Sequence, residues 1–388
     1  MNRIYMDNAA TTRVTEPVFE AMEPFFCEIY GNPSSVHSFG RDARRAVESA
    51  RRQTASALCA DAREIYFTGC GTEADNWAVR GAAYAPGNAR KTVVTTAIEH
   101  PAVLNAVRQL EKEGFRAVYV PVTREGIVDM DAMRRAITED TFLVSVMTAN
   151  NEVGSLQPIR QICALAHEAG ALMHTDAVQA VGSIPVDVNE LGVDLLSLSG
   201  HKFHGPKGIG ALYVKNGVRI DRFMRGGEQE RAQRAGTENL AGIVGLGKAA
   251  ELAASAADAR SRAVSALRDA LIDGVLKRIP LSRVNGSMDR RLPGNANFSF
   301  AGVEGESLLL NLDLRGIAAS SGSACSSGSL DPSHVLMAMG LAAEEAKGSV
   351  RLSLNEENTM AEVEAVVNAL YEIVPRLRSM SGFVTRAD

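Results

Sequence analysis

A lysine in a glycine-flanked turn is the first feature of this chain that indicates chemistry. The turn over residues 199–202 (Ser-Gly-His-Lys) begins 23 residues beyond Asp176, and Gln179 lies just after that acid. Pyridoxal phosphate (PLP) needs a lysine amine for its Schiff base, a carboxylate for its pyridinium nitrogen, and donors for its phosphate and phenolate oxygens. The spacing therefore predicts a PLP site built on Lys202 and Asp176.

A glycine-rich turn over residues 68–72 predicts a second part of this site. Gly71 and Thr72 lie where the turn opens into an expected helix. Free backbone N–H groups and the positive end of a helix attract a phosphate, and Thr72 adds a hydroxyl group. Glycine turns before helices are common, so this segment indicates a phosphate site only together with the lysine turn.

Two further polar residues follow expected strands. His100 comes after the strand 92–96, where a flat imidazole could stack on the pyridine ring and move protons; an ordinary loop histidine is the alternative. The segment 150–154 comes after the strand 142–147, and an amide of Asn150 or Asn151 there could bond the phenolate oxygen or a substrate carboxylate. The same Asn-Asn-Glu-Val-Gly segment is also simply a good turn.

The last third of the chain adds a thiol and a guanidinium group. Cys325 lies in a segment of small residues, 320–328, and a reactive thiol needs such exposure and freedom to approach its target. Arg351 alternates with apolar neighbours in a strand-like run, and a guanidinium pairs bidentately with the carboxylate of an amino-acid substrate. An incidental loop cysteine and a surface arginine are the alternatives. With Lys202, these residues predict a PLP enzyme whose cysteine takes part in the reaction.

Length and composition exclude several other classes of protein. At 388 residues the chain is too long for one ordinary core, so two domains are expected. The net charge of −5 argues against nucleic acid as the main partner, and the basic run 41–52 is typical of a solvated helix face. No apolar run reaches the roughly 18 residues of a membrane span, and the first residues resemble no signal peptide. The five scattered cysteines indicate reduced thiols in the cytoplasm and predict neither a disulfide framework nor a metal site.

Short apolar runs alternate with helical patterns through the first two thirds of the chain. The expected strands are 92–96, 117–121, 142–147, 171–175, 194–199 and 210–214, and the expected helices include 73–83, 102–113, 130–137 and 159–169. This alternation predicts an α/β fold with a mostly parallel sheet that is covered on both faces. Ligands bind beyond the carboxyl ends of the strands in such sheets, so Asp176 and the turn 199–202 can face one pocket.

A smaller domain is expected after this sheet. A periodic, Ala-rich pattern predicts one long helix over 249–277, and we place the domain change within it. Further on we expect strands over 295–300 and 349–354, a final helix from residue 360, and a helix over 331–339 with Asp331 as N-cap and Gly340 as stop. The predicted division is a large PLP-binding domain, 13–255, and a small α+β domain made of 1–12 with 256–388, which carries the Cys325 loop.

With these residues in view, the sequence closely resembles the NifS/IscS-type cysteine desulfurases, class V aminotransferases among the fold-type I PLP enzymes. The resemblance covers nearly the whole chain. Its motifs, in order, are 5–12 (YMDNAATT), 31–35 (GNPSS), 72–76 (TEADN), 99–100 (EH), 150–154 (NNEVG), 176–179 (DAVQ), 199–202 (SGHK), 234–237 (RAGT), 321–325 (SGSAC) and Arg351. The combination is highly specific, although no single motif would be.

The resemblance implies a role for each matching residue. Lys202 would form the Schiff base, Asp176 would face the pyridinium nitrogen, and His100 would stack on the ring. Arg351 would bind the substrate carboxylate, and Cys325 would be the nucleophile that accepts sulfur. The remaining contacts to the phenolate side and the phosphate would come from Asn151, Gln179, Gly71, Thr72, Ser199 and His201. Thr237 would reach the phosphate of a second subunit, which implies a homodimer.

The implied reaction converts L-cysteine to L-alanine and leaves the sulfur as a persulfide on Cys325. Lys202 and His100 would move the protons. The sulfur would go to an acceptor, for example a scaffold protein of the IscU or NifU kind in iron–sulfur cluster assembly; nitrogenase maturation and tRNA thiolation stay open. A selenocysteine lyase, or another PLP-dependent aminotransferase or lyase, is the alternative. Residues 379–388 lack the extended histidine-ending tail of IscS-type members, so scaffold docking by another route stays open.

Overall fold

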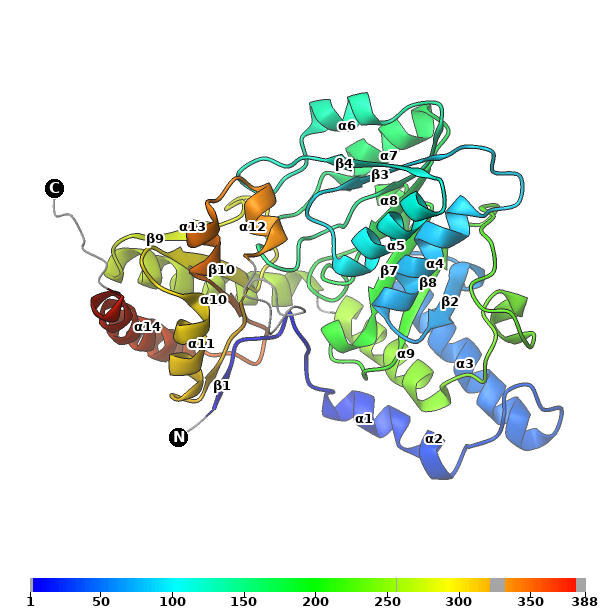
Figure 1. The fold of residues 1–388 in the computed structure, drawn as a ribbon. Coiled ribbons are helices and arrows are strands. Elements are labelled where there is room, and N and C mark those ends of the chain that lie inside the picture. Colours follow the sequence, from blue (N-terminus) through cyan, green and yellow to red (C-terminus); the bar gives the residue numbers. More distant parts are fainter. Residues whose placement is uncertain (1–2, 256, 322–331, 382–388) are drawn as a thin grey trace.

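The computed structural model describes residues 3–255, 257–321 and 332–381 (Figure 1). Within these residues, a seven-stranded sheet forms the centre of the larger part of the molecule, in the order β2-β8-β7-β6-β5-β3-β4. Its strands are β2 (Ile65–Thr68), β3 (Thr92–Thr96), β4 (Arg116–Val120), β5 (Thr141–Ser145), β6 (Leu172–Asp176), β7 (Leu195–Ser199) and β8 (Gly210–Val214). Strands β3 to β7 are parallel, and β8 runs antiparallel to both β7 and β2. The predicted α/β class and mostly parallel sheet are confirmed.

Helices cover both faces of this sheet because successive strand residues point to opposite sides. Val94, Val144 and Leu196 share one core with α3 (Ser38–Ala57), α7 (Ile159–Glu168) and α9 (Leu240–Ser255). Their chain neighbours Val93, Leu143 and Leu195 share the opposite core with α4 (Gly71–Ala83) and α5 (Pro101–Lys112). Each buried strand therefore contributes to two cores, which leaves its carboxyl end as the place for polar chemistry.

A separate hydrophobic core holds the smaller part of the molecule together. Here an antiparallel sheet in the order β12-β10-β9 packs with three helices. The elements are β9 (Ser282–Asn285), β10 (Asn295–Phe300), β12 (Ser349–Ser353), α10 (Ala257–Arg278), α11 (Gly305–Asp313) and α14 (Met360–Met380). The parallel pair β1 (Ile4–Tyr5) and β11 (Ile317–Ala318) belongs to this part, so the chain begins there and crosses to the larger part at α1 (Glu16–Met22) (Figure 1). The exact domain limits, 13–255 and 1–12 with 256–388, stay a prediction.

Two expected helices differ from the structure. The single helix over 249–277 is wrong: α9 ends at Ser255, α10 begins at Ala257, and their directions differ by 76°. The reason is packing, since α9 lies against α3 in the larger part and α10 against α14 in the smaller one. Helix α12 (His334–Ala338) is shorter than expected, and Ser333 caps it; Asp331 lies outside the described residues. Gly340 has a φ of +85°, which confirms it as the stop.

The remaining short helices are α2 (Pro24–Cys27), α6 (Met130–Ala136), α8 (Val188–Leu191) and α13 (Ala343–Lys347). Strands β2 and β9 are not among the expected elements, because runs of four residues carry little periodicity. In the part of the chain that the structure describes, no single helix is long and apolar enough to span a membrane, and only the bent pair α9 and α10 passes that test jointly.

Candidate active site

The carboxyl ends of β6 and β7 open into a cavity of about 350 Å³. Most of the residues predicted from the sequence line it together, although they come from distant segments. These residues are Gly71, Thr72, His100, Asn151, Asp176, Gln179, Ser199, His201, Lys202 and Arg351. The edge of the sheet thus brings the expected cofactor and substrate residues to one place.

One end of the cavity has the properties of a phosphate site. Helix α4 begins at Gly71, and a Cβ added there would lie 2.7 Å from Val178 Cγ2 and 3.3 Å from Ser199 Cβ, so a side chain would not fit. The hydroxyl of Ser199 is buried and has no hydrogen-bond partner among the described residues. Burial, followed by the charges of Lys202 and Lys207, lowers the pKa of His201 to about 4. A helix N-terminus with an unpaired buried hydroxyl fits an oxyanion.

Lys202 lies at the centre of the cavity, under the N-terminal segment of the chain. Its Nζ donates to the carbonyl oxygens of Ala9 (2.7 Å) and Ala10 (2.8 Å), and Gln179 Nε2 also donates to Ala9 O (2.9 Å). The Thr12 hydroxyl donates to the carbonyl oxygen of His201 (3.0 Å). The segment that starts in the smaller part therefore covers the lysine.

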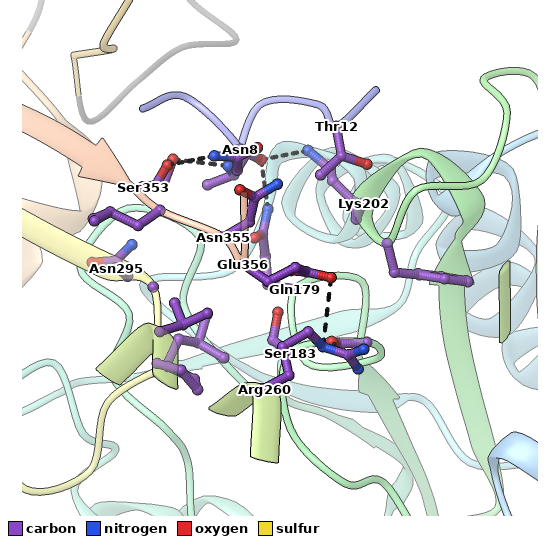
Figure 2. Close-up of a pocket in the computed structure, with 18 of the residues that line it drawn as sticks. Asn8, Thr12, Gln179, Ser183, Lys202, Arg260, Asn295, Ser353, Asn355 and Glu356 are labelled. Atoms are coloured by element: carbon purple, nitrogen blue, oxygen red, sulfur yellow. Dashed lines mark hydrogen bonds and ion pairs between the residues drawn. The ribbon is translucent and has the colours of Figure 1, made fainter. Parts of the chain in front are cut away.

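A second, smaller pocket of about 70 Å³ adjoins the cavity at the same lysine. Figure 2 shows Lys202 and Gln179 among the residues that line it, with Arg260, Asn295 and Glu356 contributed from beyond residue 255. Arg260 donates to the carbonyl oxygen of Gly182 (3.1 Å). Lys202 is thus accessible from the boundary between the two parts of the molecule as well as from the cavity.

Asp176 and His100 form an acid–imidazole pair in the wall of the cavity. Asp176 Oδ1 accepts a hydrogen bond from the Val178 N–H (2.9 Å). Burial raises the pKa of Asp176, while His100, this backbone bond and Lys202 act in the other direction. Burial also lowers the pKa of His100, whose Nδ1 accepts from the Ala102 N–H at the start of α5 (3.2 Å). His100 is therefore a neutral imidazole beside a carboxyl group.

Arg351 provides the cationic side of the cavity. The residue is only 1% exposed; its Nη1 donates to Asn151 O (2.8 Å) and its Nη2 to Asp7 Oδ1 (3.0 Å). Asn150 fills the turn by accepting from the N–H groups of Glu152 and Val153, both at 2.9 Å. The alternative interpretation as a turn former therefore applies to Asn150, whereas Asn151 lines the cavity.

Thr237 is the predicted residue that the structure describes away from the cavity. Thr237 lines a different pocket, with Gly69, Glu230 and Arg234. Its expected contact with the phosphate of a second subunit stays a prediction. Cys325 lies outside the described residues.

Sequence reasoning assigned no role to three residues that the structure places at this site. Asp7 pairs with Arg351, and Cys70 and Asp75 line the cavity. A signal for Asp75 was present, because it follows Gly71 by four residues and so lies on the same face of the helix. Asp7 belongs to the quoted motif 5–12, but nothing local indicates its partner, which is 344 residues away.

Comparisons with known proteins agree with this geometry. The profile of the aminotransferase class-V family matches residues 4–366. The chain is similar to the cysteine desulfurase IscS of Clostridium botulinum strain Hall (52% identity; 98% of this chain and 97% of the relative) and to that of Methanosarcina thermophila (52%; 97% and 93%). Among solved structures, it resembles a NifS-like protein (TM-score 0.91, 38% identity, 97% and 100% coverage) and SspA in complex with cysteine (0.81, 35%, 91% and 99%).

Proposed function

The chain belongs to the class-V aminotransferase family, and from this premise we propose that it is a PLP-dependent cysteine desulfurase. It converts L-cysteine to L-alanine and passes the sulfur to its own Cys325. The observation that carries the proposal is the single cavity lined by a lysine, a buried acid, an open phosphate cradle and a buried arginine. Relatives named cysteine desulfurase support the reaction, and the neighbour solved with cysteine supports the substrate.

PLP fits the residues at both ends of the cavity. Gly71, Thr72, Ser199 and His201 would hold the phosphate, because the helix N-terminus and the unpaired Ser199 hydroxyl supply donors there. At the other end, Asp176 would hold the ring nitrogen, with His100 against the ring and Gln179 and Asn151 near the phenolate oxygen. When bound, the cofactor supplies an electron sink for the bond that breaks at the substrate Cα.

Arg351 would bind the carboxylate of L-cysteine. The guanidinium is held by Asp7 and by the Asn151 carbonyl, and its buried Nε has no hydrogen-bond partner among the described residues. A guanidinium group that is held in place and still has an N–H without a described partner can bind a planar carboxylate. Asn151 would add an amide on the same side of the substrate.

Lys202 and His100 are placed to move protons. Lys202 Nζ would take the proton from the substrate Cα and deliver it within the same cavity, and the Ala9 and Ala10 carbonyl groups hold this amine in position. His100 would act as the second proton carrier. Because burial lowers the pKa of its imidazole, His100 starts neutral and can accept a proton.

The two ends of the segment that carries Cys325 support a role for this thiol. The backbones of Ser320 and Arg351 exchange two hydrogen bonds: the Arg351 N–H donates to Ser320 O (2.7 Å), and the Ser320 N–H donates to Arg351 O (3.1 Å). On the other side of the segment, the Ser333 hydroxyl donates to the carboxylate of Glu152, the neighbour of Asn151. Both ends thus start beside the proposed substrate site.

Four residues beyond Ser321 can span up to about 13 Å, which sets the reach of the Cys325 thiol from this end. The Cys325 thiolate would attack the substrate sulfur, so that the C–S bond breaks, an S–S bond forms on Cys325, and the remaining carbon fragment gains a proton to become alanine.

A homodimer and an acceptor protein complete the proposal. Large apolar side chains from α1 to the start of α3, including the loop after α2, are more than half exposed in the single chain: Phe19, Phe26, Tyr30, Val36 and Phe39. Exposed aromatic residues gathered in one stretch of the chain are typical of a subunit interface. A second copy would also explain why Thr237 lies away from the cavity of its own chain.

The acceptor of the sulfur would be a scaffold protein for iron–sulfur clusters. A cytoplasmic location stays a prediction.

The test is the stoichiometry of products from L-cysteine. The purified protein, with PLP and a thiol reductant, should release sulfide and alanine in equal amounts, and Cys325→Ser should abolish sulfide release while PLP absorbance persists. Cys59→Ser, a change at an exposed cysteine outside the quoted motifs and the apolar patch, is the matched control and should keep full turnover. Full sulfide release by Cys325→Ser would contradict the proposal. Much faster turnover of L-selenocysteine would favour the lyase instead.

A further inference from the structure

We propose that Asp75 carries the proton of a buried Asp75–Asp176 carboxyl pair, so that Asp176 is the ionised member that faces the cofactor ring. Asp75 would then be a positioning residue, since it acts through Asp176. The part played by the ring nitrogen rests on the proposed function, whereas the carboxyl pair itself is a property of the folded chain.

The two acids lie close together in a site with little access to water. Asp75 follows Gly71 by one helical turn on α4, is 1% exposed, and lines the same cavity. One carboxylate oxygen of Asp75, one of Asp176 and a ring nitrogen of His100 all lie within 4.8 Å of one another. Two negative charges at such a separation repel strongly when they are buried, so the pair retains a proton.

The surroundings of the two acids are unequal. Asp176 accepts a backbone hydrogen bond from Val178 and has the charge of Lys202 nearby, both of which favour its ionised form. Asp75 Oδ1 has no hydrogen-bond partner among the described residues. Burial and then the charge of Asp176 raise the pKa of Asp75 well above its ordinary value; the hydroxyl of Ser197 acts the other way, and Glu99 and Cys70 raise the pKa further. The proton therefore resides on Asp75.

A histidine near Asp75 does not change this assignment. His174 Nε2 lies 3.7 Å from Asp75 Oδ1, but burial lowers the pKa of His174 to about 3, so this imidazole is neutral. Both of its nitrogens already have hydroxyl partners, Ser145 Oγ at 2.8 Å and Ser197 Oγ at 3.0 Å. His174 thus supplies no positive charge that would stabilise an ionised Asp75.

This arrangement would serve the cofactor. With Asp75 neutral, the site presents one negative charge, that of Asp176, to the ring nitrogen. When the protonated ring binds, Asp176 stays ionised and Asp75 keeps its proton. Binding therefore needs no proton from solvent. Helix α4 carries both Asp75 and the phosphate-binding turn at Gly71, so one rigid element sets the distance between the two ends of the cofactor site. A buried acid that holds a proton at a cost in stability is typical of a functional site.

Infrared difference spectroscopy on the full-length protein, with PLP and after its removal, tests where the proton resides. The carboxylic-acid C=O stretch should be lost in Asp75→Asn and should persist in Asp176→Asn. Glu99 and Glu152 are also buried near the site, and burial raises the pKa of Glu99 to about 8, so Glu99→Gln and Glu152→Gln are measured in parallel to identify the bands of these two acids. A spectrum unchanged by Asp75→Asn, or a band lost in Asp176→Asn, would overturn the proposal, and the second variant decides alone if the first does not fold.

The pH dependence of unfolding gives an independent readout. A carboxyl group whose pKa is higher in the folded state makes the protein less stable as pH rises above the unfolded value of about 3.9. Relative to Asp75→Asn, the folding equilibrium constant of the PLP-free wild type should fall about tenfold per pH unit over this window. Parallel stability curves for the two proteins would overturn the proposal. If sulfide release fails but the Asp75-specific band loss is seen, the proposed function is wrong and the carboxyl pair stands.

Discussion

The buried Arg351 and the partly exposed Asp7 form an ion pair that joins two distant segments of the chain. Arg351 Nη2 on β12 lies 3.0 Å from Asp7 Oδ1, and 344 residues separate the two in sequence. Backbone bonds support this pair, because the Asn8 N–H donates to the carbonyl oxygen of Ser353 (3.2 Å). The guanidinium is thus oriented before any substrate binds. Less conformational entropy of the arginine side chain is therefore lost on binding.

Arg351→Lys should raise the KM for L-cysteine much more than it lowers kcat. An ammonium group cannot make the bidentate contact, and loss of one partner of a buried charge pair costs about 2 kcal/mol or more, or roughly thirtyfold in kcat/KM. Steady-state kinetics measures this split. Asp7→Asn keeps the guanidinium but releases it, so its effect should be smaller and in the same direction. An unchanged KM in Arg351→Lys would show that the carboxylate binds elsewhere.

Ser199→Ala should have opposite effects on the empty and the loaded protein. The buried hydroxyl has no partner among the described residues, so its removal should raise the thermal midpoint without PLP by the equivalent of about 1 kcal/mol, yet weaken PLP binding about tenfold. Calorimetry and a PLP titration measure the two quantities. Ser197→Ala is the matched control on the same strand, because its hydroxyl bonds His174, so this change should lower the midpoint. A PLP affinity unaltered by Ser199→Ala would remove this residue from the phosphate site.

Glu230→Ala should be among the most destabilising single changes in the larger part. Glu230 forms two hydrogen bonds of 2.8 Å with the buried Arg51 and accepts from the Phe67 N–H. These contacts hold three successive non-glycine residues, Glu230 to Ala232, at φ values of 45°, 57° and 62°. The change leaves Arg51 with only the half-exposed Glu48 and the Ile65 carbonyl oxygen as partners, and removing one partner of a buried ion pair costs about 3–5 kcal/mol.

Denaturant unfolding measures this loss of stability. Arg45→Ala, on the same helix as Arg51, breaks only an exposed pair with Asp42 and should change stability by less than about 0.5 kcal/mol. Equal effects of the two changes would contradict the importance of the buried pair.

The His204–Glu356 contact should make stability depend on pH near neutrality. His204 Nε2 lies 3.7 Å from Glu356 Oε1 across the boundary between the two parts. Burial alone would lower the pKa of His204, but the hydrogen bond and charge of Glu356 raise it above its ordinary value. The stabilisation is therefore complete below the unfolded value of about 6.5 and is lost as pH rises through the folded pKa. Thermal midpoints should show this decline in the wild type and not in His204→Gln; the same pH profile in both would refute it.

The chemistry of the site was predictable because its signals are local. The turn 199–202 and Asp176 each follow a buried strand, and parallel strands bring their carboxyl ends to one edge whatever the loops between them do. The same reasoning gave the strands β3 and β8 with correct limits. For the basic run 41–52, the expected solvated face holds for Arg41, Arg44, Arg45 and Arg52 but not for the buried Arg51. That exception comes from Glu230, which no pattern on the helix could indicate.

What the sequence by itself determined is the set of reactive groups, the α/β alternation that gathers them, and the family resemblance. Only the tertiary structure decided which groups pair: Asp7 with Arg351, Asp75 with Asp176, and Arg51 with Glu230. It also decided that the helical pattern over 249–277 breaks after Ser255, because α9 and α10 bury their apolar faces in different cores. The physical reason is common to all of these. Local patterns report the period of a helix or strand, whereas pairing and breaking depend on contacts between segments far apart in the chain.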